Sequence, residues 1–233
     1  MLCIRWFNRT AAAALAFILL LYPVPCLRAQ ASPSNQGTLH FLFAVGAQIA
    51  KQGDSKAVPV EGNTVLTSGD RIKFFLEPTS VGYFYLLHLG PDGDLSLLFP
   101  PDPPKAHVPA GQQFYVPEGP LWFELDAASG KEKFFFLASK SRLSQLESLY
   151  ARLATLKDRA DIQSSTQAVL DEITSLNKKR RSLAAPAEKP VRIAGKFRAP
   201  SNTDSAALPD ITPFAKEIVA QGFYSKTLTI EHR

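Results

Sequence analysis

The side chains of this chain that could perform chemistry are four histidines and a small group of aspartates in turns. The histidines are His40, His88, His107 and His232. A zinc site needs several ligands at short, characteristic spacings, and an HExxH motif places two histidines on one helix face. His88 has no second histidine or carboxylate at such a spacing. We therefore predict that His88 is a packed or rim histidine of a strand.

The acidic turns give no clear sign of a site. Residues 92–94 resemble part of a calcium loop, but the other ligands and the terminal Glu are missing. Ser68 lies in a turn without the Gly-x-Ser-x-Gly context of a nucleophile elbow. We predict that Asp70, Asp92 and Asp94 accept backbone N–H bonds in turns, and we assign no catalytic, cofactor or metal site. Folding could still unite Asp and His groups, so a hydrolase remains an alternative.

The elements that hold these residues are predicted to form a β-meander. Residues 82–89 alternate between two largely apolar faces, which is typical of a strand covered on both sides. Residues 91–94 supply Pro, Asp and Gly for a turn, and residues 95–99 return as a second strand that two prolines end. Upstream, residues 71–77 alternate in the same way.

This region resembles a bacterial family, the domain of unknown function 4384. The motifs that carry the resemblance are Ser68-Gly-Asp-Arg-Ile, Gly82-Tyr-Phe-Tyr-Leu, Asp92-Gly-Asp-Leu-Ser-Leu-Leu-Phe-Pro and Ala110-Gly, with residues 130–139 similar to the closing strand of the family. The resemblance covers about residues 39–139, and the proline-rich segment 100–104 departs from it, since relatives often place an Asn after the Pro. The family has no known catalytic residues. Its members are envelope or secreted proteins or lie beside signalling and protease-like modules, which implies an accessory or binding role.

Residues 1–31 are predicted to be a secretory signal peptide. Two arginines precede an apolar run, residues 11–22, which is too short to span a membrane. A small-x-small cleavage site at residues 29–31 follows. We expect a secreted or periplasmic mature chain that begins at Ser32 and has no integral membrane span. A retained anchor is one alternative, and a lipid on Cys26 is another, disfavoured because Pro25 precedes that cysteine.

Composition narrows the classes of partner. Both cysteines, Cys3 and Cys26, lie in the predicted signal peptide, so the mature chain would have no disulfide and no thiolate site, which suits an oxidising compartment. The chain has 26 Lys and Arg against 21 Asp and Glu, and three of the basic residues belong to the signal peptide. The mature net charge is then about +2, which gives little support for a polyanion. We expect no nucleic-acid partner.

The mature chain is predicted to be α+β, mainly β with a helical appendage. Residues 32–38 are polar and expected to be disordered. Residues 39–140 hold about seven short strands separated by turn signals, which favours an antiparallel β-sandwich or an open barrel. Residues 141–181 change to helical spacing and predict a helical hairpin or one broken helix, with a capping box at Ser144 and Glu147.

The rest of the chain is predicted to return to the β-domain. Residues 182–213 contain five prolines and are expected to form a loop. Residues 214–233 include a predicted strand at 223–231. A lone strand is not stable in water, so we expect it to pair with the β-domain and close it.

An aromatic surface is the remaining candidate site. Aromatic residues are frequent in the β-domain, and most must be core. Those on an outward face could form a patch that binds a partner. The candidates for a partner-binding surface are Tyr83, Tyr85, Tyr115 and Trp122.

The leading hypothesis is therefore a secreted or periplasmic, non-catalytic β-module that binds an envelope component, either an unknown protein or an envelope glycan, without a cofactor. A hydrolase is the first alternative. A scaffold that pairs through the helices at residues 143–176 is the second.

Overall fold

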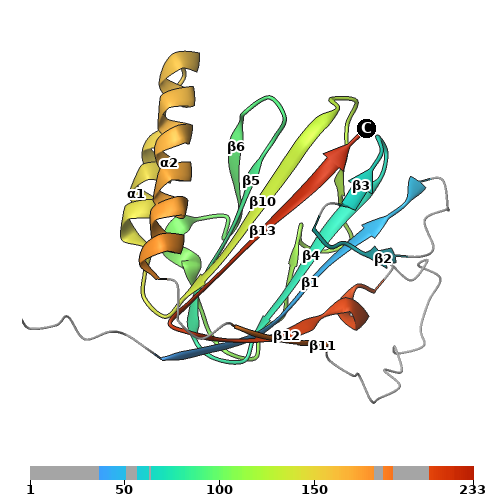
Figure 1. Ribbon diagram of the computed structural model, residues 1–233, viewed down its shortest axis with the longest axis vertical. Coiled ribbons are helices and arrows are strands. Elements are labelled where there is room, and N and C mark those ends of the chain that lie inside the picture. The colour runs from blue at the N-terminus through green and yellow to red at the C-terminus, as the bar shows by residue number, and fades with distance from the viewer. Residues whose placement is uncertain (1–36, 51–56, 63, 181–185, 191–209) are drawn as a thin grey trace, which may run out of the picture. The chain divides into compact units, whose positions relative to one another are not determined.

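The computed structural model describes residues 37–50, 57–62, 64–180, 186–190 and 210–233 (Figure 1). The predicted signal peptide, most of residues 32–38 and most of the predicted loop at 182–213 lie outside these ranges. In the described part of the chain, neither helix has the length and apolar character that a membrane span requires.

The described strands form two sheets. Sheet A contains β1 (Thr38–Gln48), β2 (Ala57–Pro59), β4 (Arg71–Pro78), β8 (Phe114–Val116), β9 (Phe123–Glu124), β11 (Ala187–Pro190) and β12 (Lys216–Gln221). Sheet B contains β3 (Thr64–Leu66), β5 (Gly82–Leu89), β6 (Leu95–Phe99), β7 (His107–Val108), β10 (Gly130–Ser139) and β13 (Phe223–His232). The order is β11-β12-β1-β4-β8 in sheet A, with β2 on β1 and β9 on β4, and β3-β13-β10-β5-β6 in sheet B, with β7 on β5. The β3–β13 pair is parallel and the other pairs are antiparallel.

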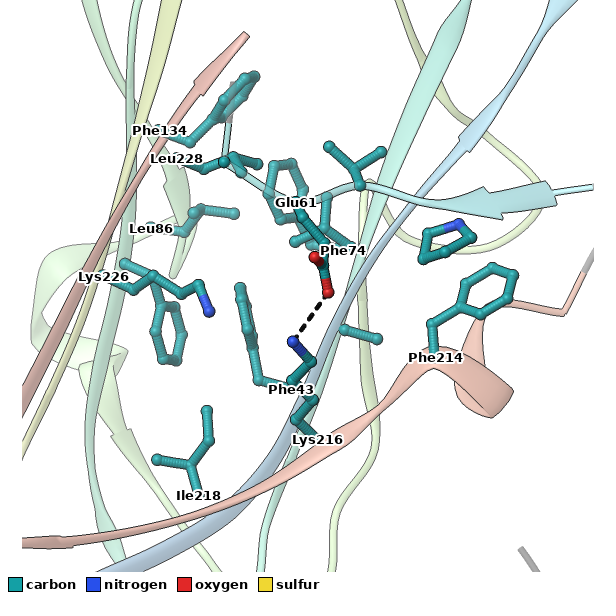
Figure 2. Close-up of a pocket in the computed structure, with 16 residues that line it drawn as sticks. Phe43, Glu61, Phe74, Leu86, Phe134, Phe214, Lys216, Ile218, Lys226 and Leu228 are labelled. Carbon is teal, nitrogen blue, oxygen red and sulfur yellow. Dashed lines mark hydrogen bonds and ion pairs between the residues drawn. The ribbon is translucent and has the colours of Figure 1, made fainter. Parts of the chain in front are cut away.

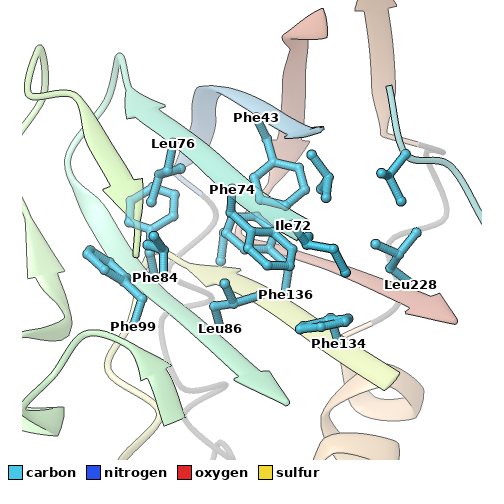
Figure 3. Packing of buried hydrophobic residues seen from close by; sticks show 14 of the residues in the cluster. Phe43, Ile72, Phe74, Leu76, Phe84, Leu86, Phe99, Phe134, Phe136 and Leu228 are labelled. Atoms are coloured by element: carbon cyan, nitrogen blue, oxygen red, sulfur yellow. The ribbon is translucent and has the colours of Figure 1, made fainter. Parts of the chain in front are cut away.

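A core rich in phenylalanine fills the space between the sheets (Figure 3). Alternate residues of each strand point inward, as the pleat requires. Phe43 of sheet A stacks on Phe136 of sheet B with ring centroids 4.2 Å apart, and Phe74 meets Phe134 at 5.0 Å. The predicted sandwich is therefore confirmed, and the described strands form two stacked sheets without closing into a barrel.

The C-terminal strand closes the sandwich as predicted. β13 pairs with β10 from Phe223 to His232. The preceding strand, β12, was not predicted, and it pairs with β1 in the other sheet. Gly222 joins the two strands with φ +67°, a conformation that favours glycine. This residue carries the chain from sheet A to sheet B.

Two helices cover the outer face of sheet B (Figure 1). They are α1 (Ser144–Leu153) and α2 (Arg159–Lys179), so the predicted helical hairpin is confirmed. The predicted capping box is wrong, because α1 begins at Ser144 without a side-chain cap and Glu147 faces the sheet. Residues 159–168, whose apolar spacing is less regular than that of the residues after them, also belong to α2. Asp158 caps the start of this helix by accepting from two backbone N–H groups.

Short segments cover parts of sheet A. Residues 187–190, within the predicted loop, form the edge strand β11 on β12, a position that tolerates proline. A 3-10 turn at Thr212–Phe214 follows Ile211, which is fully buried against the outer face of β1 and β4.

Candidate functional site

The four aromatic candidates do not form one surface. Tyr85 is only 1% exposed, because α1 covers it, and its hydroxyl donates to Glu147 at 2.7 Å. The prediction that Tyr85 belongs to a partner-binding surface is therefore corrected: it is a core residue. Tyr83 lies on the same face of β5, half-buried, with its ring 5.1 Å from that of His107.

Tyr115 and Trp122 come together on the outer face of sheet A, around a buried lysine. The Lys73 ammonium lies 5.6 Å from the centroid of each ring and donates to the carbonyls of Gly119 and Leu121. Burial lowers the pKa of Lys73, and burial together with nearby carboxylates raises the pKa of Tyr115. The two rings cover a cation and are only partly available to a partner.

Asp70 and Asp92 behave as predicted, whereas Asp94 takes part in its turn through backbone groups. The Asp70 carboxylate accepts from the backbone N–H groups of Ala50 at 2.9 Å and Thr67 at 2.8 Å. Asp92 accepts from the N–H of Asp94 at 3.1 Å. These bonds hold the chain reversals before β4 and between β5 and β6.

A polar cluster at one end of sheet B was missed from the sequence. His88 lies on the inner face of its strand, and its Nε2 is 2.5 Å from Oε2 of Glu132. The other carboxylate oxygen, Oε1, is 3.7 Å from Nδ1 of His232, whose Nε2 is 3.2 Å from Oγ of Ser68. The strand register explains why His88, Glu132 and His232 come together, because β10 lies between β5 and β13. Phe134 of β10 pairs with His88, and Glu132 lies two residues before Phe134 on the same strand.

The series Ser68, His232 and Glu132 resembles the serine, histidine and carboxylate of a hydrolytic triad, but the hydrogen bond between the histidine and the carboxylate is not formed. The 3.7 Å separation is too long for a hydrogen bond, and Nδ1 of His232 is buried without a partner among the described residues. The adjacent cavity of 270 Å³ is lined by His88, Glu132 and several acidic residues, whereas Ser68 lies outside its lining. Within the described ranges, no group of three or more His, Cys, Asp or Glu side chains could hold a metal ion.

A second cavity opens between the two sheets, and we call it the intersheet pocket (Figure 2). Its volume is 190 Å³. The apolar walls come from both sheets and include Phe43, Phe74, Leu86, Phe134, Phe136 and Leu228. Residues 59–62, at the end of β2 and directly after it, also line the pocket. Such a concave apolar site with a few polar groups is the usual form of a small-molecule pocket.

Charged side chains surround the mouth of this pocket. The Lys216 ammonium lies 2.9 Å from Oε1 of Glu61, and this ion pair crosses the opening (Figure 2). Lys226 extends from β13 and pairs with Glu188 at 3.2 Å. The hydrogen bond and charge of Lys216 lower the pKa of Glu61. Burial alone would raise the pKa of Glu188, but the Tyr224 hydroxyl and Lys226 hold it below its usual value.

Residues 65–142 match the model of the Domain of unknown function (DUF4384) family. The predicted resemblance is confirmed. The match begins later than the predicted start at about residue 39, so β1 lies outside it, as do both helices and the C-terminal strands. No curated protein and no solved structure matches the chain.

The DUF4384 match divides the intersheet pocket into two parts. Phe74, Leu86, Phe134 and Phe136, on its walls, lie in the matched segment. The charged residues of the mouth, Glu61, Lys216 and Lys226, lie outside it. The matched segment therefore supplies part of the apolar wall, and flanking residues such as Phe43 and Leu228 supply the rest together with the charged mouth.

The pocket was also missed from the sequence, although one signal for it exists. In the predicted strand 223–231, Lys226 falls in phase with Tyr224, Leu228 and Ile230, which are buried. A lysine at an inward position of a strand departs from the usual alternation. This departure indicates an opening in the core at that point.

Proposed function

We propose that this chain is a secreted or periplasmic, non-catalytic binding module whose ligand enters the intersheet pocket. The observation that supports the proposal is the pocket itself, a 190 Å³ apolar space between the sheets with ionic groups at its mouth. A well-packed sandwich fills this space with side chains. An opening of this size and composition is suited to an apolar group of a ligand.

A hydrolase is the second candidate, and the contact between Ser68 and His232 favours it. A serine nucleophile needs a base that a third group orients and a cavity in which the substrate meets it. Here the third contact is 3.7 Å long and the neighbouring cavity does not include the serine. Ser68→Ala should therefore leave any esterase activity on p-nitrophenyl acetate unchanged, and its loss in that variant would favour the hydrolase.

The binding proposal is tested with a neutral apolar probe. We expect 1-octanol to cause saturable shifts in the methyl NMR resonances of Leu86 and Leu228, which line the pocket. Gly62→Trp should weaken this binding at least tenfold, because Gly62 lines the pocket and a Cβ there meets nothing within 4 Å. The large side chain can therefore occupy the opening without a clash at its first atom.

The matched control is Leu121→Trp, which adds the same side chain at a residue 64% exposed and outside the pocket lining. It should bind octanol as the unchanged chain does. Shifts that never saturate, or that are equal in Gly62→Trp and the unchanged chain, would refute binding in the pocket.

A further inference from the structure

Two lysines occupy core-facing positions at the open side of the sandwich. Along β12, Lys216 alternates with Ile218 and Ala220, and both of these are buried in the core between the sheets. Along β13, Lys226 lies between Tyr224 and Leu228 in the same way. Each ammonium group is therefore directed to the mouth of the intersheet pocket by the pleat of its strand.

The backbone fixes where these cations are. Lys216 pairs with Phe43 of β1 on one side and with Pro190 of β11 on the other, and Lys226 pairs with Phe136 of β10. Phe43 and Phe136 are also the stacked rings of the pocket wall. The backbone of each lysine therefore lies beside the apolar interior, Lys216 on sheet A and Lys226 on sheet B.

Glu61 marks the position where an anion is favoured. Its carboxylate bridges the opening to Lys216 and also feels the charge of Lys226, and both cations lower its pKa. The side chain of Glu61 is 70% exposed, and an ion pair this open to water contributes little to stability. A ligand anion can therefore replace Glu61 on Lys216 at small cost. Glu188, by contrast, is also held by the Tyr224 hydroxyl at 2.7 Å.

We infer that the intersheet pocket binds a small amphiphile with an apolar body and a carboxylate head, with the body among the phenylalanine rings and the head between Lys216 and Lys226. This inference rests on the proposed binding function. A cavity of about 150 Å³ holds a benzene molecule, and the intersheet pocket has 190 Å³. The apolar body accordingly has about eight heavy atoms by proportion, the size of a medium acyl chain or a phenylalkyl group.

The test is a calorimetric or NMR titration of the mature chain with three probes that share one tail: octanoate, 1-octanol and octylamine. Octanoate should bind about tenfold more tightly than octanol, a difference of about 1.4 kcal/mol, and octylamine should bind most weakly. Raising the NaCl concentration to 0.5 M should weaken octanoate binding and leave octanol unchanged, because salt screens exposed charges.

Variants at the mouth test the role of each charge. Lys216→Gln should weaken octanoate binding about tenfold and change octanol binding less than twofold, because only the head group contacts this residue. Glu61→Gln should strengthen octanoate binding about threefold, since it removes the internal carboxylate that competes for Lys216. Lys131→Gln, at an exposed residue outside the pocket lining, is the matched control and should change neither.

The outcomes distinguish the specificity for a carboxylate head from the binding of any ligand in the intersheet pocket. If octanol and octylamine bind as tightly as octanoate and Lys216→Gln has no effect, the pocket is real and the carboxylate specificity is refuted. If none of the three probes reaches the methyl groups of Leu86 and Leu228, the proposed function fails, and the inference fails with it. Lys226→Gln gives the second variant if Lys216→Gln lowers the melting temperature.

Discussion

The hydroxyl group of Tyr85 joins the helices to sheet B, and its removal should have a measurable cost. It donates to Oε1 of Glu147 at 2.7 Å and accepts from the backbone N–H of Leu143 at 3.3 Å. Both Tyr85 and Glu147 are buried. Tyr85→Phe leaves a buried carboxylate oxygen and a buried N–H without this partner, while the second carboxylate oxygen keeps its contact with Arg142.

The magnitude follows from the charge and burial of these groups. A hydrogen bond to a charged group contributes about 1.5–3 kcal/mol, and an unsatisfied buried N–H costs about 1 kcal/mol or more. We expect Tyr85→Phe to lower the free energy of unfolding by about 3 kcal/mol, which corresponds to a drop in melting temperature of roughly 6–12 °C for a chain of this size.

Urea denaturation followed by circular dichroism measures this change. Tyr83→Phe is the matched control, because Tyr83 lies two residues earlier on the same face of β5 and is half-exposed. It should cost less than about 0.5 kcal/mol, as surface substitutions usually do. The double variant Tyr85→Phe/Glu147→Gln should be less destabilised than the sum of the two single changes, since the pair acts as a unit. Equal costs for Tyr85→Phe and Tyr83→Phe would refute this account.

Three further predictions concern the C-terminal strand, the tyrosines and the N-terminus. Removal of residues 222–233 deletes β13 from between β3 and β10, so the truncated chain should lose its cooperative thermal transition in calorimetry; an unchanged transition would show that β13 is dispensable. Burial, with Glu147 and Glu188 adding to it, raises the pKa of Tyr85 and Tyr224. The folded state therefore holds these protons more tightly than the unfolded state, so stability should be constant below the usual tyrosine pKa of about 10 and fall as pH rises above it. An ultraviolet titration of the mature chain should show two tyrosines that ionise only on unfolding, and free titration of all five of its tyrosines would contradict it. The intact mass of exported material should correspond to a chain that begins at Ser32, and a mass that retains residues 1–31 or a lipid would exclude signal cleavage at that point.

The β-meander and its turns were predictable because their information is local. Alternation identifies β5, the Pro-Asp-Gly turn identifies the hairpin, and helical spacing after Leu143 identifies the switch to helices. The C-terminal strand was predictable for a different reason, because Tyr224, Leu228 and Ile230 indicate a strand and a lone strand is not stable without a sheet.

The sites depend on pairing between distant segments, which local patterns do not encode. His88 and Glu132 are separated by 44 residues, and their meeting follows from the register of β5 on β10. Tyr85 and Tyr115 have similar sequence surroundings, yet one is covered by α1 and the other lies on the opposite sheet. The intersheet pocket requires knowledge of both strands that meet at Gly222, of which only one was predicted.

The corner at Gly222 also constrains the order in which the chain can fold. The strands on either side of it fill interior positions, β12 between β11 and β1 and β13 between β3 and β10. Neither sheet can be completed until residues 216–232 have been synthesised, although β1 is synthesised long before them. For example, His40 of β1 contacts Glu217, which lies 177 residues later in the chain. Until then β1 and β10 each expose an unpaired edge, which is prone to aggregation. Folding of the sandwich therefore has to wait for the synthesis of residues 216–232, and we expect it to be slow because its contacts are distant in sequence.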